Sequence, residues 1–86
     1  MNITFTEHGW DDFPYWIVQD KKLVVKIMKL IKDIRCHPYE GIGKPEALKH
    51  ELSGSWSRRI NQEHRLVYKI DEEADVCYIM QCRSHY

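Results

Sequence analysis

The sequence predicts an α+β domain in which two N-terminal helices pack on one face of an antiparallel-dominated sheet of four to five strands. Three observations support this prediction. The chain has 86 residues, so residues 1–86 form a single domain with one modest core. A hydrophobic fraction of 43% is typical of a folded protein. Strand-like periodicity occurs at the start, helical periodicity follows, and strand-like segments return in the second half.

The first segments predict a short strand and a helix. Ile3 and Phe5 alternate with polar residues, which is the period of a half-buried strand. Apolar residues recur at helical spacing over about residues 7–19, and Thr6 is a suitable N-cap. Pro14 would remove a hydrogen bond from the interior of this helix. Either the helix kinks at Pro14, or its regular part starts near Asp11.

A second helix is expected after Asp20, which can cap it. Its apolar residues recur every three or four positions and should lie on the sheet, while its lysines fall mainly on the other side. We interpret the lysines as a solvated face rather than as an RNA site. The apolar positions are Leu23, Ile27, Leu30, Ile31 and Ile34, and the lysines are Lys22, Lys26, Lys29 and Lys32.

A loop and three strands follow. Two prolines and two glycines within residues 37–45 exclude a continuous helix or strand there. Strands are predicted over residues 55–61, 64–70 and about 76–81, with acidic turn residues at 71–75.

The register of the first hairpin follows from the cost of burying charge. A three-residue loop centred on Gln62 pairs Arg59 with Arg65 on one open face, whereas a two-residue loop would put one arginine into the core. Arg58 falls on the other face, where we expect an ordinary surface charge or a side chain reaching outward at the sheet edge. The expected core aromatic residues are Trp10, Trp16, Trp56 and Tyr68.

Charge and composition exclude several classes of function. The formal net charge is zero, whereas a protein that binds naked nucleic acid by electrostatics alone is usually basic. Positive charge is local, between Gly43 and Leu66, which indicates a site. The histidines and cysteines show no short-spaced ligand pair, so we expect neither a metal nor a cofactor. Three cysteines without a signal peptide or membrane span predict a cytoplasmic protein that is not in a membrane.

Several motifs occur together along the whole chain: Gly43 to His50 (GKPEALKH), Ser55 to Ile60 (SWSRRI), His64 to Tyr68 (HRLVY) and Cys82 to Tyr86 (CRSHY). Trp10-Asp11-Asp12 and Tyr15-Trp16 precede them. In this order and spacing they resemble the YoeB-type toxins of the RelE/ParE superfamily, which belong to type II toxin–antitoxin systems. The resemblance implies the RelE-like microbial ribonuclease fold.

The resemblance also implies an activity. It points to a metal-independent endoribonuclease that cleaves messenger RNA in the aminoacyl site of the ribosome. Glu46 matches the general base and His85 the general acid, while Arg65 and Tyr86 match the positions that hold the scissile phosphate and nucleotide. Lys49 and Arg59 match supporting basic positions, and Lys44 is a further candidate for binding RNA phosphate. The implied partners are the ribosome, mRNA, a YefM-like antitoxin and a second copy of the chain in a homodimer.

The chemistry is consistent with these residue types. RNA cleavage without a metal uses attack by the neighbouring 2′-hydroxyl, which needs a base and an acid for the leaving 5′-oxygen. A carboxylate and an imidazole provide both near neutral pH. Alone, a glutamate such as Glu46 is more often a loop carboxylate paired with a lysine, here Lys44 or Lys49, and only the matching motifs reverse this preference. The rival function is a non-catalytic inhibitory binding module of the ParE type acting on a protein target, and the presence of Glu46 with His85 separates the two hypotheses.

Overall fold

The structure, a computed structural model, describes residues 1–83 of the chain. Strand β1 (Asn2–Phe5) leads into helix α1 (Glu7–Gln19) and helix α2 (Lys21–Cys36). The second half contains β2 (Glu46–Ala47), a 3-10 helix (His50–Leu52), β3 (Trp56–Arg59), β4 (Arg65–Asp71) and β5 (Val76–Gln81).

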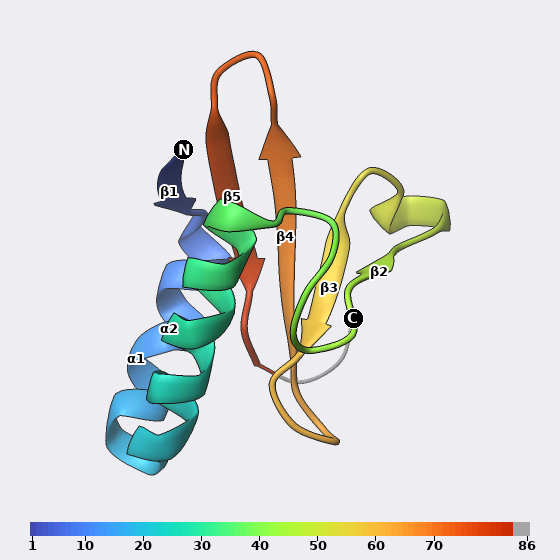
Figure 1. Cartoon of the computed structure of the whole chain (residues 1–86). Coiled ribbons are helices and arrows are strands. Elements are labelled where there is room, and N and C mark those ends of the chain that lie inside the picture. Colours follow the sequence, from blue (N-terminus) through green and yellow to red (C-terminus); the bar gives the residue numbers. More distant parts are fainter. Residues whose placement is uncertain (84–86) are drawn as a thin grey trace.

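The strands form one five-stranded sheet in the order β1-β5-β4-β3-β2. The β1–β5 pair is parallel and the other pairs are antiparallel. Both helices lie on one face of this sheet (Figure 1), where Ile27, Leu30 and Ile34 of α2 share a core with Leu66 and Tyr68 of β4. The predicted fold is therefore confirmed. The strand β2 was not predicted, because two residues directly after a proline carry no periodicity.

Helix α1 runs through Pro14 without an interruption in its helical assignment. Of the two alternatives left open by the sequence, a regular part that starts near Asp11 is therefore wrong, because the helix begins at Glu7. The Thr6 side chain caps the helix by accepting a hydrogen bond from the Gly9 N–H at 3.2 Å, as predicted. Gly9 also lets the helix approach β5, because a Cβ there would lie 2.3 Å from the carbonyl oxygen of Ile79. Cap and close packing together fix the early start of the helix.

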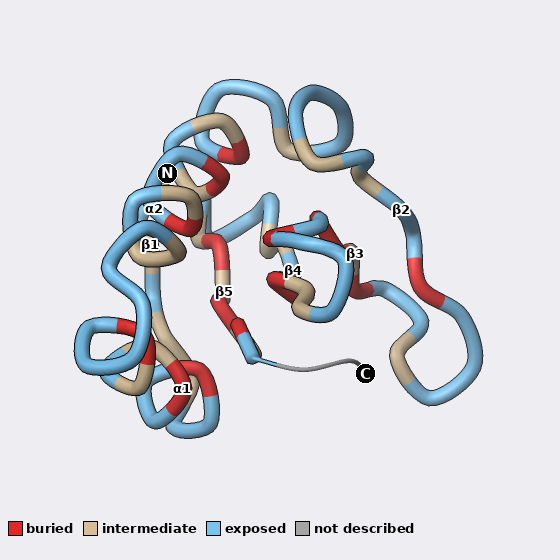
Figure 2. The backbone as a smooth tube through the Cα atoms, turned by 90° about the horizontal axis from the view of Figure 1, so that it is seen from below, coloured by how far each residue is buried: buried red, intermediate tan, exposed pale blue. Residues whose placement is uncertain are grey.

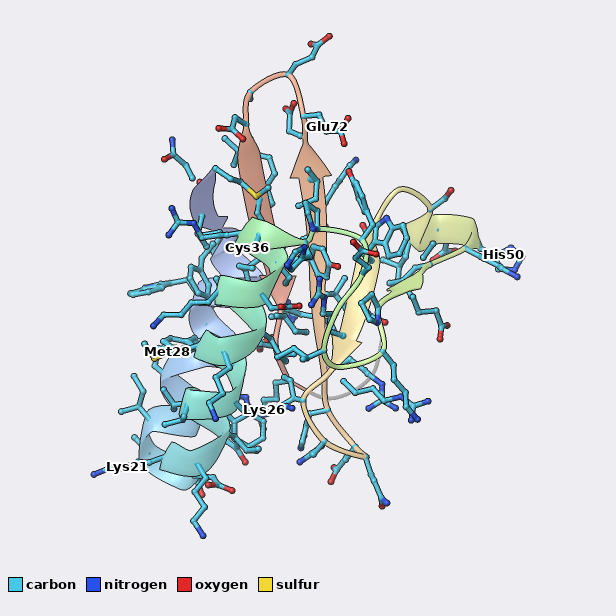
Figure 3. The ribbon with its side chains drawn as sticks, in the orientation of Figure 1. Lys21, Lys26, Met28, Cys36, His50 and Glu72 are labelled. Atoms are coloured by element: carbon cyan, nitrogen blue, oxygen red, sulfur yellow. The ribbon has the colours of Figure 1, made fainter. Side chains whose placement is uncertain are left out.

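Helix α2 follows the prediction closely. Asp20 accepts a hydrogen bond from the Lys22 N–H at 3.0 Å and so caps the helix. The predicted apolar face is buried at its centre, and most of the lysines are exposed on the outer side, where Figure 3 labels Lys21. Figure 2 shows the same separation, with buried positions on the inner sides of the helices and along the central strands. Lys22, Lys29 and Lys32 thus form a solvated face, whereas Lys26 is half-buried and lines a hollow with Lys44 and Arg59.

One expected core residue lies at the surface. Trp16 is buried, but Trp10 is 59% exposed, so its assignment to the core was wrong. Trp10 packs edge-on against Phe5 at a centroid distance of 5.8 Å and leaves most of its ring outside. Four other apolar side chains of the two helices are also exposed: Ile17, Val18, Val25 and Met28.

Candidate active site

The pairing of the strands places Glu46 in a row of residues across the sheet. Glu46 pairs with Ser57, Ser57 with Val67, and Val67 with Gln81. Directly paired residues point to the same face, and the adjacent row, which contains Trp56 and Tyr68, packs with the helices. The row from Glu46 to Gln81 therefore lies on the face turned away from the helices.

The two hairpin arginines lie on this same face. Arg59 pairs with Arg65, as the three-residue loop predicted. The Arg65 guanidinium donates to the carbonyl oxygens of Asn61, Gln62 and His64 at 2.8, 3.2 and 3.1 Å, so the loop holds it in place. Within residues 1–83 neither arginine forms an ion pair with a carboxylate. Their charge is thus free to meet an anion from outside.

The other candidate site residues line two shallow hollows. Glu46 and Lys49 line one of about 350 Å³, together with His50. Lys44 and Arg59 line another of about 350 Å³. Among the described residues Glu46 makes no ion pair with Lys44 or Lys49, so the interpretation of Glu46 as a paired loop carboxylate is not supported.

A larger hollow of about 550 Å³ lies elsewhere, beside the β4–β5 turn. Three of its lining residues are the acidic Asp71, Glu72 and Glu73. Figure 3 shows Glu72 near that turn, well apart from His50 beside β2. These three carboxylates repel phosphate, so the largest of the three hollows is not the best candidate for an RNA site.

Arg58 is the main correction to the sequence prediction. It is completely buried rather than a surface charge. A guanidinium has five N–H donors, and here each finds an acceptor. The acceptors are the Asp33 carboxylate, the Tyr68 hydroxyl (3.2 Å) and the carbonyl oxygens of His37, Glu40 (2.9 Å) and Ile42 (3.1 Å). The loop over residues 37–43 thus folds around one buried cation.

The groups around Arg58 are mutually supporting. Tyr68 donates its hydroxyl to the Pro38 carbonyl at 2.6 Å, and the Asp33 carboxylate also accepts from the Ile42 N–H at 3.1 Å. The hydrogen bond from Arg58 holds the pKa of Asp33 below its usual value. Burial raises the pKa of Tyr68. Arg58 is therefore a neutralised structural anchor and does not itself face a substrate.

This anchor sets the path of the chain into β2. Gly43 has a φ of +79°, and a Cβ there would lie 2.7 Å from Leu30 Cδ2. Its carbonyl accepts the Arg59 N–H at 2.7 Å, which fixes the loop against β3 just before Lys44 and Glu46. The glycines of the predicted loop are thus required where the backbone approaches the core, and the loop delivers Glu46 to the sheet edge.

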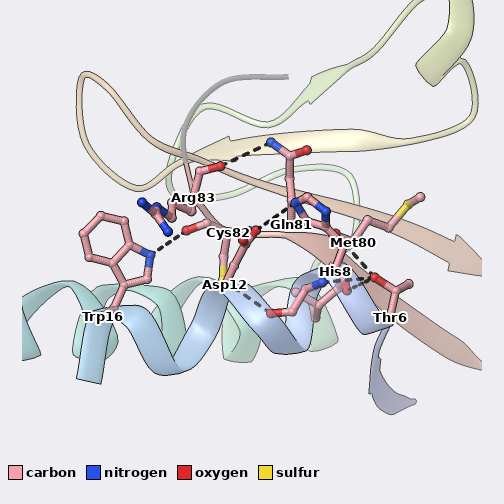
Figure 4. A network of polar contacts seen from close by, with 10 residues as sticks. Thr6, His8, Asp12, Trp16, Met80, Gln81, Cys82 and Arg83 are labelled. Carbon is pink, nitrogen blue, oxygen red and sulfur yellow. Dashed lines mark hydrogen bonds and ion pairs between the residues drawn. The ribbon is translucent and has the colours of Figure 1, made fainter. Parts of the chain in front are cut away.

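The other end of the row leads toward the C-terminus. Strand β5 ends at Gln81, and Asp12 and Trp16 of α1 hold the backbone of Cys82 (Figure 4). His85 and Tyr86, the predicted acid and nucleotide-binding residues, lie outside the described residues.

No helix of the described chain is both long and apolar enough to cross a membrane. Residues 1–83 contain no group of three His, Cys, Asp or Glu side chains placed to hold a metal ion.

Comparisons with known proteins agree on one family. Residues 5–86 match the family model for the YoeB-like toxin of bacterial type II toxin–antitoxin systems. Toxin YoeB of Escherichia coli (strain K12) is 55% identical over 86 residues, covering 100% of both chains.

Solved structures agree as well. The YoeB/ParE toxin from Agrobacterium tumefaciens superposes with a TM-score of 0.96 at 42% identity, covering 100% of both chains. A YoeB dimer from Staphylococcus aureus gives a TM-score of 0.90 at 48% identity, and a heterotetrameric YoeB–YefM toxin–antitoxin complex from that organism gives 0.89 at 48% identity. Each covers 100% of this chain and 98% of the other.

Proposed function

The chain belongs to the YoeB-like toxins of bacterial type II toxin–antitoxin systems, and from this premise we propose that it is a metal-independent, ribosome-dependent mRNA endoribonuclease. It cuts the message in the aminoacyl site by attack of a 2′-hydroxyl on the adjacent phosphorus. The observation that carries this proposal is the row across the sheet, which has Glu46 at one end and Gln81, four residues before His85, at the other.

The dimensions of the sheet support a shared substrate for the two groups. Neighbouring strands lie about 4.8 Å apart, so three spacings separate Glu46 from Gln81 by about 14 Å. Four extended residues span up to about 14 Å. The chain after Gln81 is therefore long enough for the His85 imidazole to serve the same RNA linkage as the Glu46 carboxylate.

Each group has a role in this reaction. Glu46 takes the proton from the 2′-hydroxyl, and the resulting oxygen attacks phosphorus while the bond to the 5′-oxygen breaks. His85 gives that leaving oxygen its proton. Arg65, which the hairpin loop holds, stabilises the charge that builds up on the phosphate, since a fixed donor needs no reorganisation. Tyr86 holds the nucleotide, and Lys44, Lys49 and Arg59 bind phosphates along the message.

The charge of the chain favours a ribosome-delivered substrate. With zero net charge, the protein lacks the general attraction to RNA that a basic surface provides. Arg59 and Arg65 give the open sheet face two cations that form no ion pair with a carboxylate within residues 1–83. The same face suits an acidic, apolar segment of a YefM-like antitoxin, which would cover the site.

Two further expectations follow from the family and the surface. We propose a homodimer, for which the exposed apolar side chains of the two helices are candidate contacts. We also place the protein in the cytoplasm, where its three free thiols would stay reduced.

A primer-extension assay on a defined message, with and without ribosomes, tests the function. We expect cleavage with ribosomes and little cleavage of free RNA. Glu46→Gln should lower the cleavage rate by about a hundredfold or more, because it removes the base. Deleting His85 and Tyr86 should abolish cleavage and leave ribosome binding intact.

The control is Glu51→Gln, an exposed glutamate five residues further along the same segment. It should cut at the wild-type rate. Undiminished cutting by Glu46→Gln would overturn the assignment of the base. Inhibition of a protein target by a wild-type chain that cuts no message would instead support the non-catalytic function.

A further inference from the structure

Helix α1 holds both backbone polar groups of Cys82, the residue directly after β5. The Cys82 N–H donates to the Asp12 carboxylate at 3.1 Å, and its carbonyl accepts from the Trp16 indole N–H at 2.7 Å (Figure 4). Asp12 and Trp16 are four residues apart and therefore lie on the same side of the helix. One helix face thus clamps one peptide segment from both directions.

The clamp is a buried arrangement. Cys82 is fully buried, Trp16 is 5% exposed and Asp12 is 9% exposed. Polar groups removed from water to this extent cost free energy unless their hydrogen bonds are made in good geometry. A displaced Cys82 would leave the buried indole N–H without its acceptor and the Asp12 carboxylate with only the exposed His8 imidazole, 3.3 Å away. The position of Cys82 is therefore strongly specified, and not only by packing.

The next residue is also held by α1. The Arg83 guanidinium carbon lies 3.6 Å from the centroid of the Tyr15 ring, which is close enough for a cation–π interaction. The Arg83 carbonyl accepts from the Gln81 side-chain amide at 3.5 Å. The chain therefore leaves the clamp in a defined direction.

The sequence distance from this clamp to the proposed acid is short. His85 follows Cys82 by three residues, a span of at most about 11 Å. A shift of the anchor would be passed on to the imidazole, and a misplacement of about 1 Å at a reacting group can cost about a hundredfold in rate. Ending strand β5 does not by itself require a buried carboxylate and an indole N–H that both bind the backbone of the following residue.

We propose that Asp12, Tyr15 and Trp16 are positioning residues for RNA cleavage, which set the origin and direction of the C-terminal tail so that His85 reaches the scissile linkage. The inference rests on the proposed function. It assigns a role to the Trp10-Asp11-Asp12 and Tyr15-Trp16 motifs of the first helix, which the acid–base chemistry alone does not use.

A double-mutant cycle separates positioning from folding. Trp16→Phe keeps an aromatic ring, although a smaller one, and removes the donor, and Asp12→Ala removes the acceptor. Each should lower the single-turnover cleavage rate at saturating ribosomes by about 10- to 100-fold, with ribosome affinity changed by less than about twofold. In a His85→Ala background each should lower the residual rate by less than about twofold, because the group they position is gone.

Conservative and neighbouring variants complete this cycle. Asp12→Asn keeps an oxygen acceptor for the Cys82 N–H and should retain cleavage within about threefold of wild type. The matched controls are Trp10→Phe and Asp11→Ala, the same residue types at exposed positions of α1, and both should cut normally. Equal losses with and without His85 would show that the clamp acts only through the fold and would overturn the proposal.

Hydrogen exchange provides a test that needs no cleavage. Asp12→Ala should speed exchange of the Cys82 amide about tenfold or more and leave the β4 amides of Leu66 and Val67 unchanged. A Cys82 amide that stays protected would show that no clamp exists. If the wild-type chain cuts no message, the proposed function fails. Hydrogen exchange at the Cys82 amide then still tests whether Asp12 holds this residue.

Discussion

Replacing Arg58 with methionine should destabilise the protein far more than the same replacement of Arg59, the other charged residue of β3. Methionine occupies similar space as an unbranched chain but removes all five donors. It leaves Asp33 as an uncompensated carboxylate beside the core, together with three loop carbonyls that had shared the guanidinium.

Breaking a buried ion pair by removing one partner costs about 3–5 kcal/mol. The lower end applies here, because the Asp33 side chain is 22% exposed and water can replace part of the loss. Against a total stability of about 5–15 kcal/mol, a loss of about 3 kcal/mol is large. For a domain of this size it corresponds to a fall in melting temperature of roughly 12–24 °C.

Urea denaturation at a fixed protomer concentration measures this loss, since stability of a dimer depends on concentration. The control is Arg59→Met on the next residue of the strand, where an exposed side chain should change stability by less than about 0.5 kcal/mol. In an Asp33→Asn background Arg58→Met should cost less, because no carboxylate is left behind. A cost below about 1 kcal/mol in the wild-type background would refute this account of the anchor.

Three more predictions concern stability and reactivity. Arg58 lowers the folded-state pKa of Asp33 below its ordinary value of 3.8. The ionised Asp33 carboxylate should therefore stabilise the fold fully above about pH 4, and this stabilisation should be lost as the pH falls through the folded-state pKa. The fall of the urea midpoint in acid should be smaller in Asp33→Asn. Gly9→Ala should lower the urea midpoint despite alanine's better helix propensity, because the added Cβ would lie 2.3 Å from a carbonyl oxygen of β5; a higher midpoint would contradict that packing. Burial raises the pKa of Cys77 and Cys82 to about 12, so a thiol reagent near pH 8 should modify only the exposed Cys36 in the native protein and all three cysteines after unfolding.

Periodicity predicted the fold because apolar and charged residues sort cleanly in most elements. The register of the β3–β4 hairpin followed from the need to keep Arg59 and Arg65 together outside the core, and the strand pairing has this register. The caps of α1 and α2 were predicted for the same kind of reason, since Thr6 and Asp20 are suitable acceptors just before helical periodicity.

The errors have a common physical origin in tertiary contacts. Arg58 is buried because a loop some twenty residues earlier supplies carbonyl acceptors, which no local pattern reveals. Trp10 has the helical spacing of a core residue, yet it contacts Phe5 edge-on and remains 59% exposed. The adjacent Arg58-Arg59 pair was a usable signal, because neighbours in a strand point to opposite faces and one arginine had to face the core.

The candidate site was only partly predictable in the same way. Spacing and the family motifs selected Glu46, Lys49, Arg59 and Arg65, and the structure shows which of them share a face or a hollow. The contacts that hold Cys82 join residues 66 and 70 positions apart in the chain, so no spacing argument could have found them. The roles of His85 and Tyr86 stay predictions.

Analysis of the RNA ends left by ribosome-bound cleavage, in the presence of a chelator that binds transition metals and leaves Mg²⁺ in place, tests the central claim most directly. Attack by the 2′-hydroxyl with proton transfer through side chains leaves a 2′,3′-cyclic phosphate and a 5′-hydroxyl, and the chelator should not slow it once ribosomes are kept intact. Products with a 3′-hydroxyl and a 5′-phosphate would contradict the proposed chemistry.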